Sequence, residues 1–230
     1  MLPKQAPSTR TTDPVVVGAS VLAVKYKGGV MMMADTLASY GSLARYTDLQ
    51  RVVPLGETAL LGGSGEYSDF QEIQKVIGEV LTSDANEDDG SKLDAKEVHS
   101  LLARILYNKR SKMNPFYNQL CIGGFVGGKT FLGLVDLYGS SFTDNFLATG
   151  YGGYLAIPIL RKKWKEDMEE GEARDLLCEC MKVLYYRDAR TINKFNIGRI
   201  TPQGITVDPP ISLPTEWSYR RFVDPHNARA

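Results

Sequence analysis

The stretch that most constrains the fold runs from Ala19 to Asp35. Residues 19–26 read ASVLAVKY, an alternation that favours a β-strand, and Gly28-Gly29 then marks a turn. The returning run, VMMMAD over residues 30–35, is apolar on both of its faces. Because such a strand must be covered on both sides, this hairpin predicts a strand buried between two layers rather than one that faces water.

The rest of the chain alternates between strand-like and helix-like segments. Strands are predicted at 51–55 and 58–62, at 119–126 and 130–137, at 146–149, and at 195–201 and 204–207. Helices are predicted at 66–81, 94–106, 153–164 and 173–189, the second with a capping box at Asp94 and Glu97. The Gly-Ser-Gly stretch at 63–65 is predicted to close a strand, and the acidic segment 84–90 to form a loop. This order predicts an α+β domain, two facing sheets with a helix pair outside each, or a four-layer αββα sandwich.

Composition excludes several classes of protein. Lys plus Arg and Asp plus Glu number 27 each among 230 residues, so the balance gives no sign of binding to nucleic acid or to an anionic membrane. No apolar run is long enough to span a membrane, and residues 1–10 lack the apolar stretch of a signal peptide. We expect one domain whose partners are other proteins.

The cysteines and histidines predict neither a metal site nor a hydrolase triad. Cys121, Cys178 and Cys180 lack metal-ligand spacing, and an odd set of this kind is typical of reduced thiols in an intracellular protein. Cys180 shares the apolar stripe of its helix, which predicts core packing. His99 lies within a predicted helix and His226 in the tail, away from any nucleophile motif. We expect no metal and no cofactor.

The hairpin carries a family resemblance. The run GASVLAVKYKGGVMMMAD, residues 18–35, resembles the opening of a eukaryotic 20S proteasome β-type subunit. Catalytic members of that family have an N-terminal threonine, an aspartate sixteen residues later and a lysine sixteen residues beyond that. The same spacing here gives Ala19, Asp35 and Arg51. The aspartate is kept, but the threonine and the lysine are replaced.

Further segments extend the resemblance over roughly residues 11–208. RDART, residues 187–191, is similar to the family's Arg-Asp-Ala-x-Ser segment and puts Asp188 and Thr191 at its aspartate and serine. In ATGYGG, residues 148–153, Tyr151 stands where active subunits have a serine. YGS, RSKMNP and VLYYRDAR, which begin at residues 40, 110 and 183, resemble the non-catalytic members at the seventh β position.

The resemblance implies an N-terminal nucleophile hydrolase fold with a structural role. Such a subunit occupies one position in a barrel of four seven-membered rings, 28 subunits in all. There it would contact both neighbouring β subunits, an α subunit and the opposite β ring. The complex carries out ATP- and ubiquitin-dependent protein degradation in the cytoplasm and nucleus, and threonines of other subunits cut the peptides. The fold of a threonine protease family would here serve ring and particle assembly.

Residue chemistry supports a silent site. In an N-terminal threonine peptidase the hydroxyl attacks the substrate carbonyl while the freed amine acts as base. Ala19 has no hydroxyl, so it can neither attack a substrate nor cleave its own bond to Gly18. The guanidinium of Arg51 stays protonated and cannot take the adjustable role of an ammonium group. We predict a structural ion pair between Arg51 and Asp35.

Two other functions stay open. Cleavage after Arg10 would expose Thr11, which could then act as a nucleophile at an unexpected N-terminus. Against this, eight residues separate Thr11 from Ala19, up to about 26 Å of extended chain. We expect processing near Thr11 that leaves a short, inert remnant. A free-standing binding protein that has reused the fold is the other alternative.

The termini and one basic cluster are predicted to meet other subunits. Residues 1–10 are assigned as a propeptide remnant, 11–208 as the domain and 209–230 as a C-terminal extension. The extension carries Trp217, Tyr219 and Phe222 among arginines and matches no core-forming element, so it is predicted to reach onto another β subunit. Arg110 and Lys112, which follow the second helix, are predicted to contact a neighbouring subunit.

Overall fold

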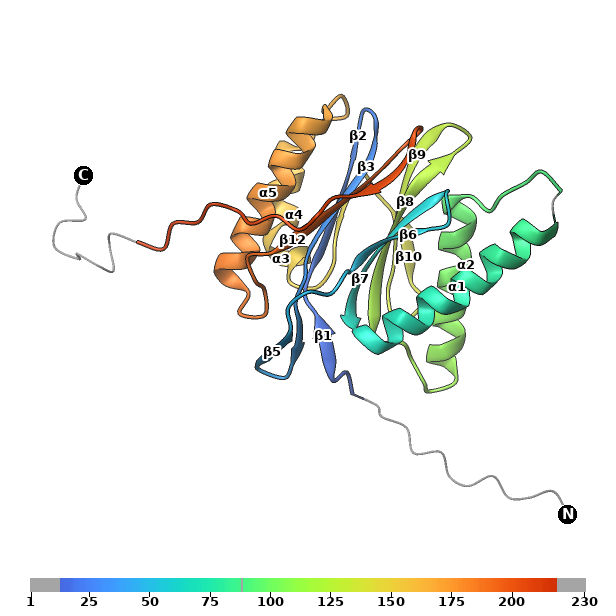
Figure 1. Ribbon diagram of the computed structural model, residues 1–230, viewed down its shortest axis with the longest axis horizontal. Helices are drawn as coiled ribbons and strands as arrows, with labels where there is room; N and C mark the ends of the chain where they lie inside the picture. The colour runs from blue at the N-terminus through green and yellow to red at the C-terminus, as the bar shows by residue number, and fades with distance from the viewer. Residues whose placement is uncertain (1–12, 88, 219–230) are drawn as a thin grey trace, which may run out of the picture.

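The computed structural model describes residues 13–87 and 89–218 (Figure 1). Its strands are β1 Val16–Gly18, β2 Val21–Tyr26, β3 Gly29–Asp35, β4 Ala38–Tyr40, β5 Leu43–Tyr46, β6 Val52–Leu55, β7 Ala59–Glu66, β8 Asn118–Val126, β9 Lys129–Val135, β10 Ser141–Thr143, β11 Phe146–Ala148, β12 Phe195–Thr201 and β13 Gly204–Val207. Its helices are α1 Tyr67–Glu87, α2 Ala95–Ser111, α3 Gly152–Leu155, α4 Ile157–Lys163 and α5 Glu170–Arg187.

Two antiparallel sheets form the centre of the molecule. The eight-stranded sheet has the order β10-β9-β8-β7-β1-β4-β5, with β6 also paired to β7, and the five-stranded sheet has the order β11-β2-β3-β12-β13. Helices α1 and α2 lie outside the first sheet, and α3, α4 and α5 lie outside the second (Figure 1). The predicted α+β class and four-layer αββα arrangement are confirmed.

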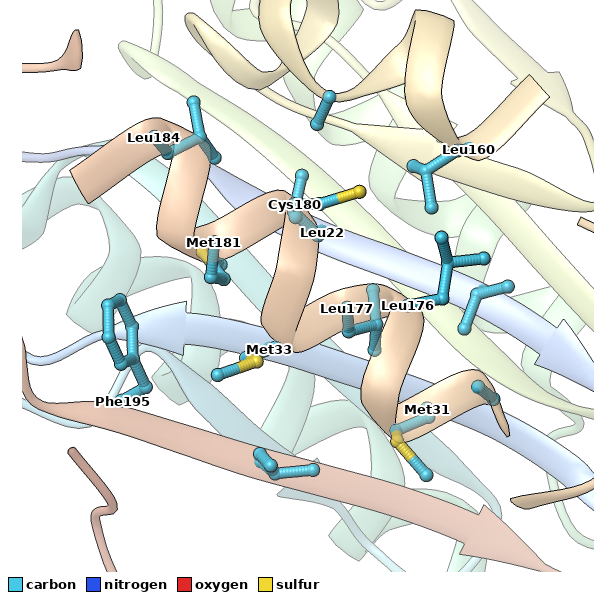
Figure 2. Packing of buried hydrophobic residues seen from close by; sticks show 14 of the residues in the cluster. Leu22, Met31, Met33, Leu160, Leu176, Leu177, Cys180, Met181, Leu184 and Phe195 are labelled. Carbon is cyan, nitrogen blue, oxygen red and sulfur yellow. The ribbon is translucent and has the colours of Figure 1, made fainter. Parts of the chain in front are cut away.

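Each interface between layers has its own apolar core. Between the sheets, one face of β2 and β3, which includes Met32, meets side chains from β6 to β9, among them Leu60 and Leu132. The other face of the same hairpin packs under α5, where Met31 and Met33 lie close to Leu177 and Met181 (Figure 2). The hairpin is thus covered on both sides, as its apolar letters predict, and every residue of β3 is buried.

Several boundaries differ from the predicted ones. Gly63 and Gly65 do not end a strand, because β7 continues through them to Glu66. Part of the acidic segment 84–90 is helical, because α1 runs on to Glu87. The predicted helix 153–164 is divided at Ala156 into α3 and α4. The capping box at Asp94 and the hairpin 195–207 are confirmed.

The first part of the predicted C-terminal extension contacts its own subunit. Ile211 forms a β-bridge with Phe195, and Leu213 is buried in the core beneath α5. Trp217 packs edge-on against Tyr185 and Tyr186 of α5, with ring centroids 5.5 and 5.0 Å away. The expectation that this segment has no core to join is therefore wrong for residues 211–213, because Ile211 and Leu213 pack into the core beneath α5.

The N-terminal strand links the two sheets. β1 is a member of the eight-stranded sheet, whereas β2, three residues after β1 ends, belongs to the five-stranded sheet. The chain therefore crosses the sandwich at Ala19 and Ser20. None of the helices in the described part of the chain is long and apolar enough to cross a membrane.

Candidate functional site

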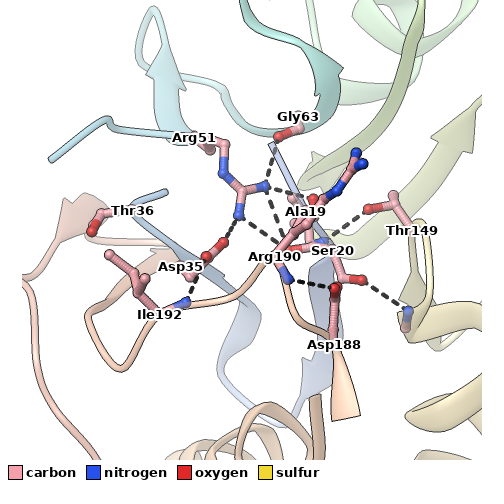
Figure 3. A network of polar contacts seen from close by, with 12 residues as sticks. Ala19, Ser20, Asp35, Thr36, Arg51, Gly63, Thr149, Asp188, Arg190 and Ile192 are labelled. Carbon is pink, nitrogen blue, oxygen red and sulfur yellow. Dashed lines mark hydrogen bonds and ion pairs between the residues drawn. The ribbon is translucent and has the colours of Figure 1, made fainter. Parts of the chain in front are cut away.

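The residues at the family's catalytic positions gather where the chain crosses between the sheets (Figure 3). Ala19 follows β1, Asp35 ends β3, and Arg51 immediately precedes β6. Asp188 follows the last residue of α5. Four segments that are distant in sequence therefore meet at one place.

Arg51 is the centre of the site. Its side chain is 1% exposed and forms an ion pair with Asp35, whose side chain is equally buried. Nη1 also donates hydrogen bonds to the carbonyl oxygens of Ala19, at 2.8 Å, and Gly63, at 3.3 Å. The predicted pair between Arg51 and Asp35 is present, and the guanidinium additionally fastens the residue at the nucleophile position to β7.

The carboxylate of Asp35 is held from two directions. One oxygen contacts Arg51, and the other accepts a hydrogen bond from the backbone N–H of Ile192 at 3.2 Å. Burial raises the pKa of Asp35, while the Arg51 guanidinium and the Ile192 N–H oppose that rise. An isolated carboxylate would be costly at this depth, so the two groups depend on each other.

Hydroxyl groups around Ala19 are engaged with the backbone. Ser20 Oγ accepts a hydrogen bond from the N–H of Gly152 at 2.9 Å, and Thr149 Oγ1 accepts one from Val21 at 2.8 Å. The Gly150 N–H donates to Gln119 Oε1 at 2.8 Å. The first two bonds join the start of β2 to the segment around α3, and the third joins that segment to β8. The Ser20 hydroxyl has no base beside it among these contacts, so it serves structure.

A cavity of about 310 Å³ opens beside Ala19 and Ser20, and Asp188 and Tyr151 also line it. Asp188 is buried, and its Oδ1 accepts a hydrogen bond from the backbone N–H of Arg190 at 2.9 Å. Thr191 donates its N–H to the Asp188 carbonyl at 3.3 Å. Asp188 thus shapes the turn after α5, and Thr191 is the one site candidate of this segment that does not line the cavity.

The groove beside the site is filled by the chain's own backbone. β1 pairs with β4 on one side, with Val17 opposite Ser39 and Gly18 opposite Ala38. On the other side it pairs with β7, where Val17 lies opposite Glu66. An extended segment leading directly into Ala19 therefore occupies the space for one strand between β4 and β7.

The remaining predicted positions lie elsewhere. The Arg110 guanidinium carbon lies 5.7 Å from the ring centroid of Tyr107, and Lys112 is the C-cap of α2; both side chains are exposed. Trp217, which packs against α5, is 60% exposed. The processing candidates Arg10 and Thr11 and the interface candidates Tyr219 and Phe222 fall outside the described residues. Within the described part of the chain, no group of three or more His, Cys, Asp or Glu residues could hold a metal ion.

Two site positions escaped the sequence prediction. Gly18 lies against the Arg51 side chain, and Gly63 supplies one of its acceptors. In the sequence, only the distance from Ala19 to Asp35 indicates that the Gly18-Ala19 pair belongs to the site. Nothing in the letters around Gly63 marks it as part of this site, since the contact depends on tertiary packing.

Comparison with known proteins identifies the class to which this fold and site belong. A family model described as proteasome subunit matches residues 15–200, and the chain belongs to that family. It is 47% identical over 218 residues to the proteasome subunit beta type-4 of Arabidopsis thaliana, covering 95% of this chain and 89% of that protein. It is 44% identical over 223 residues to the beta type-4 subunit of Xenopus laevis, covering 96% and 92%.

A yeast relative extends the comparison. The proteasome subunit beta type-7 of Saccharomyces cerevisiae is 36% identical over 205 residues, covering 85% of this chain and 77% of that protein. The resemblance to core-particle β subunits of the type-4 group is confirmed, and with it the sandwich of the N-terminal nucleophile hydrolase type. Subunits of this family assemble with other proteasome subunits.

Proposed function

We propose that this chain is a non-catalytic, structural β subunit of the 20S proteasome core particle. The observation that carries the proposal is the state of the nucleophile position: Ala19 has a methyl group, and its carbonyl accepts a hydrogen bond from Arg51. The side chain that would attack a peptide is missing. The cation beside it is used as a structural donor.

The occupied groove supports the same conclusion. In a peptidase of this fold an extended substrate needs backbone partners along the cleft that leads to the nucleophile. Here β1 takes up the pairing positions of β4 and β7 on both of its sides. A substrate would have to displace a strand of the eight-stranded sheet before it reached Ala19.

We assign the chain a role in ring and particle assembly, in the cytoplasm and nucleus, where it would border two β neighbours, an α subunit and the opposite β ring. Residues 219–230 and the Arg110 region are the proposed contact segments. Removing residues 219–230 leaves Leu213 and Trp217 in place and is expected to slow the formation of complete particles. An unchanged assembly rate, measured by native electrophoresis over time, would show that residues 219–230 are not needed for assembly.

The decisive experiment is the intact mass of this chain after native particles are treated with an epoxyketone that requires an N-terminal threonine. The expected result is an unlabelled chain that begins near Thr11, with labelled sibling subunits as the internal positive control. A labelled mass would show that Thr11 or another new terminus is an active nucleophile, and the chain would then be an N-terminal threonine peptidase.

A further inference from the structure

Glu66 stands out among the buried acids because its side chain faces the N-terminal strand. It is the last residue of β7 and is 8% exposed. Its backbone already takes part in the pairing of β7 with β1. Among the residues that the structure describes, no basic side chain forms an ion pair with it.

The donors to this carboxylate come from the strand itself. Glu66 Oε2 accepts hydrogen bonds from two consecutive backbone N–H groups, those of Val15 and of Val16, the latter at 2.9 Å. Val16 is the first residue of β1 and Val15 precedes it, so both N–H groups come before the register with β7 begins at Val17. One carboxylate oxygen of β7 therefore binds the two residues that come before the backbone pairing of β1 with β7. Bonds to a charged acceptor are stronger than the neutral backbone bonds of the ladder.

Glu66 is itself firmly fixed. Its Oε1 accepts a hydrogen bond from Ser68 Oγ at 2.9 Å. Its backbone N–H donates to the Tyr117 carbonyl at 2.9 Å, and its backbone carbonyl accepts from Asn118 Nδ2 at 2.9 Å. Three donors therefore bind the side chain, and Tyr117 and Asn118, at the start of β8, bind the backbone. This is how a buried carboxylate is accommodated without a cation.

The side chains of the strand alternate between the two sides of the groove. Val16 lines a hollow with Tyr46, Leu49 and Tyr67, whereas Val17 lines the cavity beside Ala19. Both valines are only half-buried, and Val15 is 40% exposed. Apolar burial alone holds such a short strand weakly, so its backbone contacts decide whether it stays in the groove.

We propose that Glu66 is a positioning residue that latches residues 15–18 into the groove between β4 and β7. The latch keeps the segment before Ala19 in place as a strand and the groove closed to other extended peptides. It acts on the backbone of the segment, so it holds the strand irrespective of the side chains at 15 and 16. The inference goes beyond the absence of peptidase activity, because it concerns what keeps the groove filled.

The test is hydrogen–deuterium exchange in intact particles that contain wild-type, Glu66→Gln or Glu66→Ala subunits. In Glu66→Ala the Val15 and Val16 amides lose their acceptor, and we expect their exchange to be at least about tenfold faster, since bonds to charged groups are worth that much or more. Glu66→Gln keeps a neutral acceptor oxygen and should give an intermediate rate. Peptides that span residues 13–20 report this change.

The matched control is Asp69→Asn. Asp69 lies three residues further on, in the first turn of α1, and accepts the Tyr117 N–H at 2.9 Å; among the described residues it accepts no hydrogen bond from β1. This variant should change exchange at Tyr117 and leave residues 15–16 at the wild-type rate. Unchanged exchange at residues 15–16 in Glu66→Ala, or an equal rise across all strands, would overturn the proposal. The epoxyketone experiment tests whether the chain has an active threonine, whereas hydrogen–deuterium exchange tests whether Glu66 protects the Val15 and Val16 amides. The proposed function and the proposed role of Glu66 can therefore fail independently.

Discussion

The side chain of Arg51 lies directly against the backbone of Gly18. A Cβ atom at position 18 would be 2.5 Å from Arg51 Cδ and 2.9 Å from Nε. Real side chains do not approach so closely, and Arg51 is held in place by Asp35, Ala19 and Gly63. A side chain at position 18 and Arg51 in its observed place therefore exclude each other.

Gly18→Ala is expected to lower the free energy of unfolding by about 1–3 kcal/mol, the usual cost of forcing extra atoms into a packed core. Urea unfolding of the purified chain measures it. Adding Arg51→Lys, whose side chain is slimmer, should make the pair less destabilised than the sum of the two single variants. Gly78→Ala in α1 is the control: nothing lies within 4 Å of the added Cβ, and alanine favours a helix, so stability should rise.

Asp35→Asn removes the countercharge of a buried guanidinium. Breaking one side of a buried ion pair typically costs about 3–5 kcal/mol, and we expect a loss of that order in urea unfolding. The exposed pair of Lys194 with Asp48, 2.7 Å apart, provides the comparison, because the Asp48 side chain is 77% exposed. Asp48→Asn should cost less than about 1 kcal/mol. Equal losses in the two variants would show that burial of the Asp35 pair carries no special energetic weight.

Restoring the hydroxyl alone should not restore peptidase activity. In Ala19→Thr the new threonine still follows Gly18 through an amide, and Arg51 is a permanent cation that cannot accept its proton. We expect no epoxyketone adduct on this chain in particles that contain the variant. Labelling of the sibling subunits shows that the probe is active. An adduct at residue 19 would mean that Arg51 and the β1 strand are no obstacle to catalysis.

His99 is expected to make the fold sensitive to mild acid. Its ring is buried under Gly133, with Nε2 3.1 Å from the Leu134 carbonyl. Burial lowers the pKa of His99, and the bond to Leu134 partly opposes that shift. The unfolded chain therefore takes up the proton first, so stability is full above about pH 6.5 and declines as the pH falls below it. Urea unfolding at several pH values should show a steeper decline for wild type than for His99→Gln; parallel curves would contradict this.

Sequence patterns predicted the long elements well, for identifiable reasons. β2 and β3 are marked by alternation and by an apolar run, and the capping box at Asp94 fixes the start of α2. Strands β1, β4 and β10 span three residues each, too few for a period-two pattern to appear. Such strands exist because neighbouring strands pair with them.

The glycines of β7 show why other boundaries were wrong. A Cβ at Gly63 would be 2.3 Å from the Phe70 ring, so the residue allows α1 to pack closely against the sheet and does not end the strand. This information lies in the tertiary structure. Within the site, the family resemblance placed Ala19, Asp35 and Arg51 at its catalytic positions, and the hypothesis of an ion pair between Asp35 and Arg51 followed from that placement. The bond from Arg51 to the Ala19 carbonyl and the filled groove could not be foreseen, because both depend on where β1 goes.

β1 fills the groove between β4 and β7, and the chain continues from it into β2 of the other sheet. The peptide bond between Gly18 and Ala19 therefore keeps β1 covalently attached to the domain whose groove it occupies. While it is intact, β1 competes for the groove at the high effective concentration of a short linker, in the millimolar range or above. Hydrolysis of this one bond would turn the strand into a free peptide subject to dilution. At the concentrations found in cells a segment so short would then leave, even with each of its hydrogen bonds unchanged. Occupancy of the groove is therefore a property of chain connectivity as much as of contact strength.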